Sequence, residues 1–190
     1  GRRARAGGWG ALFSDEGSSH WLAREGLRLF SRMSDGRMPR GPLYEHVRRH
    51  FALQSDLDLC AAIYGQYIAN RSRFAQLSRL VAAAAAEGDP GALGLFQSAA
   101  GELADMVDAV RAQLHIPAEA VVPVSSSGGM FQPGNGLREA LSSELRRRSA
   151  EYRFIEARLP PDVGAAIQAA RLDGAPLSTE SLAALASATK

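Results

Sequence analysis

The chain has 190 residues, of which 46% are hydrophobic and 22% charged, which is typical of a globular protein of one large domain or slightly more. A formal net charge of +2 is too small to indicate a nucleic-acid-binding surface, although the sequence pI is about 9.0. The longest apolar run covers residues 80–86, far short of a membrane span, and the arginine-rich residues 2–5 precede no apolar signal-peptide core.

The most informative stretch comes first, at residues 7–21, where glycines, two adjacent carboxylates, serines and two tryptophans stand together. We expect a short extended segment at residues 9–13, then a turn, then a helix with Ser18 or Ser19 as its N-cap. Glycines let a backbone approach a ligand closely, and a carboxylate at such a turn can accept hydrogen bonds from a neutral polyhydroxyl ligand. Taken singly, the same residues are also typical of an ordinary polar turn before a capped helix.

Apolar residues at helical spacing predict a series of amphipathic helices over the first two thirds of the chain. The expected helices cover residues 21–33, 43–51, 55–64, 71–87 and 90–114. Gly65 is expected to end the third helix and Gly88 the fourth. Asp89 and Pro90 then supply an N-cap and a first-turn proline for the fifth.

The helix expected at residues 55–64 holds the only cysteine of the chain. Ser55 or Asp56 would cap this helix, and Cys60 is expected to be a small core residue. One cysteine excludes an internal disulfide and fits a reducing compartment, so we expect a cytoplasmic protein.

After Pro117 the pattern changes, because β-branched residues run into Ser126, Ser127, Gly128 and Gly129. The expected elements are strands at residues 120–125 and 152–157 and helices at residues 137–148, 163–173 and 178–188. Strand, glycines, helix and strand in this order predict a parallel βαβ unit beneath a helical layer. The predicted fold class is therefore α/β with helix in excess.

Two charged groups are weaker candidates for a site. His46 and His50 stand four residues apart, a spacing found in metal sites, but no third ligand is evident and a solvated helix face is the preferred interpretation. Arg146, Arg147 and Arg148 could reach a phosphate, but a cationic helix C-terminus explains them better. We therefore predict no metal-binding residue.

The order of residues in the first stretch resembles a known family. Gly-Gly-Trp-Gly at residues 7–10, four further residues, Asp-Glu-Gly-Ser at residues 15–18 and then Trp21 are similar to the N-acetylglucosamine kinases among the BadF/BadG/BcrA/BcrD ATPases. The resemblance implies that this turn holds the hydroxyls of a sugar. The implied substrate-binding residues are Gly8, Trp9, Gly10 and Asp15. This chain departs from the family at Ser14, where glycine is usual, and the role of Glu16 stays open between contact with metal-bound water and shaping of the turn.

Later segments extend the resemblance along nearly the whole chain. Residues 127–131 resemble the Ser-Gly-Gly-Val-Phe loop that lies against the adenosine of ATP in the family, and residues 159–166 resemble its Pro-Pro-x-x-Gly-Ala-Ala ending. The resemblance thus implies nucleotide contacts at Gly128 and Gly129, although a plain strand–helix turn has the same pattern. The alanine-rich helix similarly implies Ala82 as a small residue beside the adenine, with close helix packing as the alternative.

The resemblance implies that residues 1–190 form the C-terminal lobe of an actin-like ATPase fold, helix-rich with a small mixed sheet. It implies a kinase that uses ATP and Mg²⁺ to phosphorylate N-acetylglucosamine or glucosamine. From the net charge and the short apolar runs we expect no nucleic-acid or membrane partner, and a homodimer stays open. The phosphate loops and catalytic aspartate of the family do not occur here, so we expect no catalytic residue and no turnover by these residues alone. The alternatives are a non-catalytic regulatory module that binds sugar or nucleotide, and a helical interaction domain whose resemblance is accidental.

Overall fold

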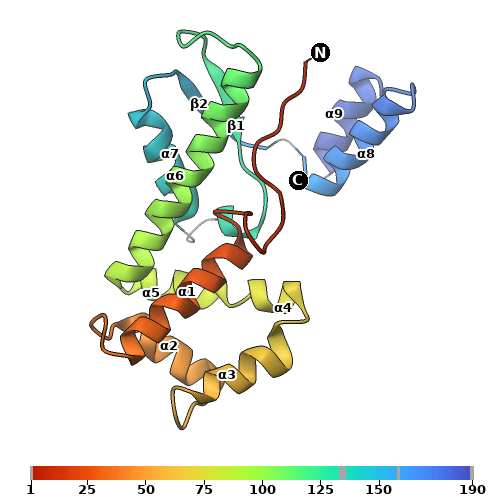
Figure 1. Cartoon of the computed structure of the whole chain (residues 1–190). Coiled ribbons are helices and arrows are strands. Elements are labelled where there is room, and N and C mark those ends of the chain that lie inside the picture. The colour runs from red at the N-terminus through yellow and green to blue at the C-terminus, as the bar shows by residue number, and fades with distance from the viewer. Residues whose placement is uncertain (1, 133–135, 158, 189–190) are drawn as a thin grey trace.

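The computed structural model describes residues 2–132, 136–157 and 159–188, whose arrangement is shown in Figure 1. The described elements are α1 (Ser19–Ser34), α2 (Pro42–Phe51), α3 (Asp58–Ala62), the π-helical turn η1 (Ile63–Tyr67), α4 (Arg71–Ala75), α5 (Ser78–Ala86), α6 (Pro90–Gln113), β1 (Val122–Ser125), the 3₁₀ turn η2 (Gly129–Phe131), α7 (Leu137–Arg147), β2 (Tyr152–Ile155), α8 (Pro161–Leu172) and α9 (Thr179–Ala188). Helix therefore predominates, as the sequence predicts.

Helix α6 links the two parts of the core. Its 24 residues give it a length of roughly 36 Å, enough to contact the helical group at one end and the strands at the other. Near its start, Ala92 and Phe96 belong to the larger core cluster with α1, α2 and α5. Further along, Ala100 and Ala104 pack in a second cluster with α7. Small alanines on one face let these helices approach α6 closely.

Strands β1 and β2 pair in parallel with α7 between them in sequence, which confirms the expected βαβ unit. Val122 lies opposite Tyr152 and Ser125 opposite Ile155. Parallel neighbours need a crossover connection, and α7 supplies it. In the part of the chain that the structure describes, the sheet consists of these two parallel strands, so the expectation of a mixed sheet is wrong there.

Arg111 joins this sheet to α6. The side chain is buried, and its guanidinium donates to the backbone carbonyls of Glu151 (3.1 Å), Ala120 (2.8 Å) and Pro117. The guanidinium carbon also lies 5.2 Å from the ring centroid of Tyr152. These contacts satisfy backbone groups just before both strands and fix the strand entrances to the helix.

Most expected helix ends are confirmed by their capping groups. Ser18 caps α1, since its Oγ accepts a hydrogen bond from the backbone N–H of Trp21 at 3.1 Å. Gly88, with φ of 83°, follows the end of α5, and Asp89 caps α6. These local signals lie within a few residues of the helix ends they mark.

The helix expected at residues 71–87 is divided into α4 and α5. Between them the backbone N–H of Leu77 bonds to the carbonyl of Phe74 at 3.0 Å, a three-residue bond that breaks the α-helical pattern. The Phe74 and Leu77 side chains are both buried in the core.

The helix expected at residues 55–64 begins only at Asp58 and continues through Gly65 as η1, so both predicted ends are wrong. The carboxylate of Asp56 caps no helix here. It instead accepts hydrogen bonds from Ser34 Oγ at 2.7 Å and the Tyr44 hydroxyl at 2.8 Å. A tertiary contact thus replaces the expected local cap.

Cys60 is exposed, so the prediction of a core cysteine is wrong. Leu59 and Ile63, one helical turn apart, take the inward positions of α3 and η1. Because each residue advances by about 100° around a helix, Cys60 is rotated away from that inward face.

Helices α8 and α9 form a pair that lies beside the rest of the chain in Figure 1. Pro161 stands at the start of α8 and Ile167 is its buried residue. No helix among the described residues is long and apolar enough to cross a membrane.

Candidate functional site

The loop before α1 folds back on itself through its own hydrogen bonds. The backbone N–H of Gly10 donates to Asp15 Oδ1 at 3.1 Å, and the Gly10 carbonyl accepts from the backbone N–H of Ser14 at 3.0 Å. Residues 11–13 therefore form a turn and Trp9 a bend, so the expectation of an extended segment at residues 9–13 is wrong. The carboxylate and the glycines of the sequence pattern are brought together in one small loop.

Asp15 lies at the centre of this loop. Its φ of 59° is in the left-handed region, which aspartate tolerates better than most residues. The Asp15 carbonyl accepts from the backbone N–H of Ser18 at 3.0 Å, which joins the loop to the N-cap of α1. Its side chain is 12% exposed, and Oδ2 forms an ion pair with Arg71. The carboxylate is thus held in one orientation at the surface.

Ser14 and Glu16 complete the turn. Ser14 is buried and its Oγ donates to Glu16 Oε2 at 3.0 Å. The serine that replaces the family's usual glycine therefore gives Glu16 a partner within the loop. This contact favours a role for Glu16 in shaping the turn.

Gly8, Trp9 and Gly10 lie beside the turn on an open face. Gly8 has φ of 69° and Gly10 has φ of 115°, and a Cβ on either would meet no atom within 4 Å. Glycine is therefore needed here for its backbone dihedrals rather than for space. Trp9 is 68% exposed, with the Arg5 guanidinium 5.4 Å from its ring. The four sequence-predicted sugar residues thus lie on one loop, with the Trp9 ring turned to solvent.

The structure adds His20 and Arg71 to this group, neither of which sequence analysis had selected. The His20 ring stacks on Phe74 at 4.6 Å between centroids, and its buried Nδ1 has no hydrogen-bond partner among the described residues. Burial lowers the pKa of His20, and the charges of Arg71 and Arg24 lower it further, while the Asp15 carboxylate acts in the opposite direction. His20 stood inside the informative stretch. Arg71 follows Asp15 by 56 residues, and no local signal connects the two.

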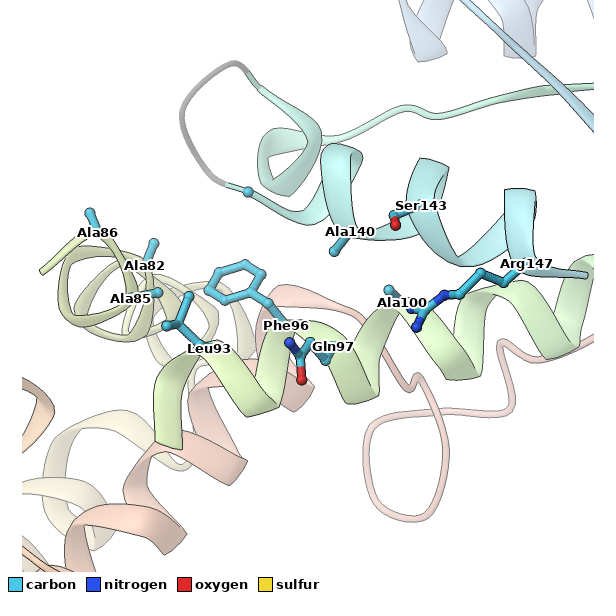
Figure 2. Close-up of a pocket in the computed structure, with 11 residues that line it drawn as sticks. Ala82, Ala85, Ala86, Leu93, Phe96, Gln97, Ala100, Ala140, Ser143 and Arg147 are labelled. Carbon is cyan, nitrogen blue, oxygen red and sulfur yellow. The ribbon is translucent and has the colours of Figure 1, made fainter. Parts of the chain in front are cut away.

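A second candidate site is a pocket of about 330 Å³ between α5, α6 and α7, shown in Figure 2. Figure 2 shows the Phe96 ring rising from α6 into the space between the alanines of α5 and Ala140 of α7. Gln97, Ser143 and Arg147 add polar groups. The other lining residues are small or apolar: Ala82, Ala85, Ala86, Leu93, Ala100, Gly136 and Ala140. Such a slot suits a flat aromatic group with a few polar atoms at its edge.

Only part of the expected nucleotide group lines this pocket. Ala82 does so, together with Gly136 and Ala140 at the start of α7, whereas Gly128 and Gly129 are not among its lining residues. Gly128, with φ of 116°, immediately precedes η2. Small residues on three separate helices converge only in the fold, so sequence analysis had no signal for Gly136 or Ala140.

Comparison with known proteins gives these two sites a context. Residues 1–169 match the BadF/BadG/BcrA/BcrD ATPase family. The chain belongs to this family. Over 167 residues it is 28% identical to the N-acetylmuramic acid/N-acetylglucosamine kinase of Clostridium acetobutylicum, a match that covers 88% of the chain and 54% of that kinase. A crystal structure of a putative N-acetylglucosamine kinase from Chromobacterium violaceum is similar, with 32% sequence identity and a TM-score of 0.56 over 77% of this chain and 46% of that one.

The match confirms the resemblance found in the sequence and supports the actin-like ATPase fold. The chain spans about half the length of these relatives.

The described residues of this BadF/BadG/BcrA/BcrD family member contain no group of three or more His, Cys, Asp or Glu that could hold a metal ion. His46 Nε2 lies 2.9 Å from Glu87 Oε1, and His50 Nε2 lies 3.4 Å from the Tyr67 hydroxyl. Each histidine therefore has a partner on the protein and belongs to a helix face that is only partly solvated.

The arginines at the end of α7 have structural partners in this ATPase-family chain. Arg148 donates to Asp105 at 2.7 Å and to Asp108 at 3.1 Å, and Arg147 pairs with Glu144 at 2.6 Å. The Arg148 contacts tie the end of α7 to α6, the Arg147 contact lies within α7, and both support the interpretation of a charged helix end.

Proposed function

We propose that this chain carries the sugar-binding turn and the nucleotide-base pocket of an ATP-dependent kinase of amino sugars. The candidate acceptors are N-acetylglucosamine, N-acetylmuramic acid and glucosamine. The observation that carries the proposal is the oriented carboxylate of Asp15, at the position that the family's sugar-binding motif indicates, in a chain of an ATPase family similar to two amino-sugar kinases.

In this proposal Asp15 accepts hydrogen bonds from sugar hydroxyls. Each carboxylate oxygen accepts more than one hydrogen bond, so the bonds from Gly10 and Arg71 leave acceptor capacity for a ligand. Gly8, Trp9 and Gly10 line the same face. Because the turn is already held by its internal bonds, the sugar binds to a preorganised group.

ATP is the proposed phosphoryl donor, with its base in the pocket of Figure 2. Ala82 and Ala140 leave room for a flat ring, Phe96 offers an aromatic surface, and Gln97 offers amide atoms to the ring edge. Gly128 and Gly129 remain proposed contacts to the nucleoside.

This chain's proposed contribution is confined to the sugar and the base. Phosphoryl transfer depends mostly on positioning and on stabilising charge around the phosphates. Residues 1–190 contain no glycine-rich phosphate loop of the family type, and the described residues contain no carboxylate cluster for a metal. The Mg²⁺ that accompanies the phosphates of ATP is therefore not assigned to any described residue. The second candidate function is a regulatory module that binds sugar or nucleotide without turnover.

The test is ATP-dependent ADP release by the full-length gene product across a panel of hexoses and amino sugars. We expect turnover with at least one of the three amino sugars and none with the hexoses. Sugar or nucleotide binding without turnover across the panel would favour the regulatory module. Absence of both binding and turnover would contradict both functions.

We expect Ala82→Leu to raise the KM for ATP about tenfold, since a larger side chain fills the pocket between α5 and α7. Ala140→Leu, from the opposite wall, should have the same effect, while the KM for the sugar stays unchanged in both. Ala112→Leu makes the same change on the exposed face of α6 and is the control. An ATP KM no higher in the two pocket variants than in the control would contradict the proposed base site.

A further inference from the structure

We propose that Arg71 is a specificity-determining residue that favours an amino sugar bearing a carboxylate, by binding that carboxylate with its guanidinium. The inference rests on the proposed function of the Asp15 turn and deepens it. It is carried by the position, exposure and charge of Arg71 relative to Asp15.

Arg71 lies at the edge of the candidate sugar site. Its Nη2 pairs with Asp15 Oδ2, yet its side chain is 64% exposed, against 12% for Asp15. A guanidinium carries several N–H donors in one plane, so a single contact to Asp15 leaves others directed to solvent. A sugar bound to Asp15 would therefore have these donors beside it.

Arg71 belongs to a helix, α4, whose position is held by a cap and by a buried side chain. Asn70 caps α4 by accepting a hydrogen bond from the backbone N–H of Arg73 at 2.9 Å. Phe74 of the same helix is buried and stacks on His20 of α1. Arg71 begins this short helix, so its backbone is held relative to the loop that carries Asp15.

Two other charged side chains near the turn, Glu16 and Arg24, already have partners of opposite charge or hydrogen-bond partners on the protein. Glu16 accepts from Ser14, and Arg24 pairs with Glu25 at 3.1 Å and donates to the Ala11 carbonyl at 3.2 Å. The Arg24 side chain is 38% exposed, well below Arg71. Of these two cations, Arg71 is therefore the better placed for an anionic ligand.

A carboxylate matches this group in shape as well as charge. The planar fork of arginine binds carboxylates through two parallel hydrogen bonds, which makes it selective for anionic, planar groups. N-acetylmuramic acid differs from N-acetylglucosamine by a lactyl ether that ends in a carboxylate. A neutral amino sugar would use Asp15, whereas an acidic one would use Asp15 and Arg71 together.

A purely structural role for Arg71 makes a different prediction. If Arg71 only orients Asp15, its loss weakens binding of neutral and acidic sugars by the same factor, because both sugars use that carboxylate. The ratio of kcat/KM for the two sugars therefore separates the two roles.

We expect Arg71→Gln, in the full-length gene product, to lower kcat/KM for N-acetylmuramic acid about 30-fold more than for N-acetylglucosamine, as loss of a charge-assisted contact implies. Arg71→Lys keeps the charge without the fork and should recover part of this ratio. Arg73→Gln is the matched control: it removes the same charge from the same helix, where Arg73 lies 4.4 Å from the Tyr67 ring centroid. Its ratio should match that of the unchanged protein.

The inference would be overturned if Arg71→Gln left the ratio of kcat/KM for the two sugars unchanged, whether or not both values fell. It would also be overturned if the variant only raised the KM for ATP with both sugars. Either outcome leaves the proposed kinase function intact. If the unchanged protein turns over neither of these sugars nor glucosamine, the proposed function fails instead. Calorimetric titration of the unchanged protein and of Arg71→Gln with each of the two sugars then tests Arg71 alone. If the sugars bind but the unchanged protein shows no preference for the acidic sugar that Arg71→Gln loses, the inference is overturned.

Discussion

Asp89→Ala is expected to lower the free energy of unfolding by about 3 kcal/mol, because it removes the caps of two helices at once and leaves buried N–H groups without partners. Asp89 is fully buried, and its two carboxylate oxygens serve different helices. Oδ1 accepts from the backbone N–H of Ala92 in α6 at 3.0 Å, and Oδ2 accepts from that of Leu43 in α2 at 2.9 Å. Such a loss is a large fraction of the stability of a typical domain.

Urea denaturation followed by circular dichroism measures this effect. Asp89→Asn should lose about half as much, roughly 1.5 kcal/mol, since its amide nitrogen can no longer accept from one of the two N–H groups. Asn70→Ala is the control, because Asn70 is an exposed N-cap with one partner, and we expect a loss of about 1 kcal/mol. A loss in Asp89→Ala no larger than in Asn70→Ala would contradict the double cap.

Asp89 also marks the boundary of what the sequence could predict. Its capping of α6 follows from the dipeptide Asp89-Pro90, whose signal acts over three residues. Its bond to Leu43 spans 46 residues and depends on how α2 packs against α5, which leads into the turn that holds Asp89, and no local pattern contains this packing. The same limit explains why the predicted helix bounds near Ser18 and Gly88, which depend on local signals, are correct. The prediction of Asp56 as a possible cap is wrong because its carboxylate takes part in a tertiary hydrogen-bond network.

The candidate site shows the same division. The family resemblance drew attention to Asp15 because the motif is contiguous, and the structure shows how the loop orients its carboxylate. Arg71 could not be found in this way, since it joins Asp15 only after α4 packs beside α1. At the second site, Ala82 was predicted from the family's alanine-rich helix, but Gly136 and Ala140 reach the pocket from α7. Residues from several elements meet there without any shared spacing in the sequence.

Asp15→Asn, in the full-length gene product, is expected to lower kcat/KM for the amino sugar about 100-fold, because hydrogen bonds to a charged acceptor contribute more than those to a neutral one. The KM for ATP should stay within about twofold, since the proposed base pocket shares no residue with the Asp15 turn. Steady-state kinetics with each substrate varied in turn gives both values. A sugar kcat/KM within a few-fold of that of the unchanged protein would refute the proposed role of Asp15.

Asparagine tests this chemistry better than alanine, because Asp15 has φ of 59° and asparagine is among the residues that adopt the left-handed region readily. Asp15→Ala removes the carboxylate but adds about 1 kcal/mol of backbone strain and frees the N–H of Gly10, so it perturbs the turn as well. If Asp15 acts on the sugar, the two variants share the same kinetic defect while only alanine lowers the thermal midpoint. If Asp15 merely holds the loop, only Asp15→Ala, the less stable variant, has a lower sugar kcat/KM, and the kinetics of Asp15→Asn are nearly normal.

Glu16→Gln distinguishes the two neighbouring carboxylates. The Glu16 side chain accepts from Ser14 within the loop, and a glutamine carbonyl can accept the same bond. We therefore expect a sugar kcat/KM within about threefold of that of the unchanged protein, if Glu16 only shapes the turn. A defect in Glu16→Gln as large as that of Asp15→Asn would instead place both carboxylates on the substrate. Asp15 and Glu16 would then both bind the sugar. If Glu16 only shapes the turn, the turn keeps its shape when Glu16 loses its charge, whereas a charged contact with the substrate is lost.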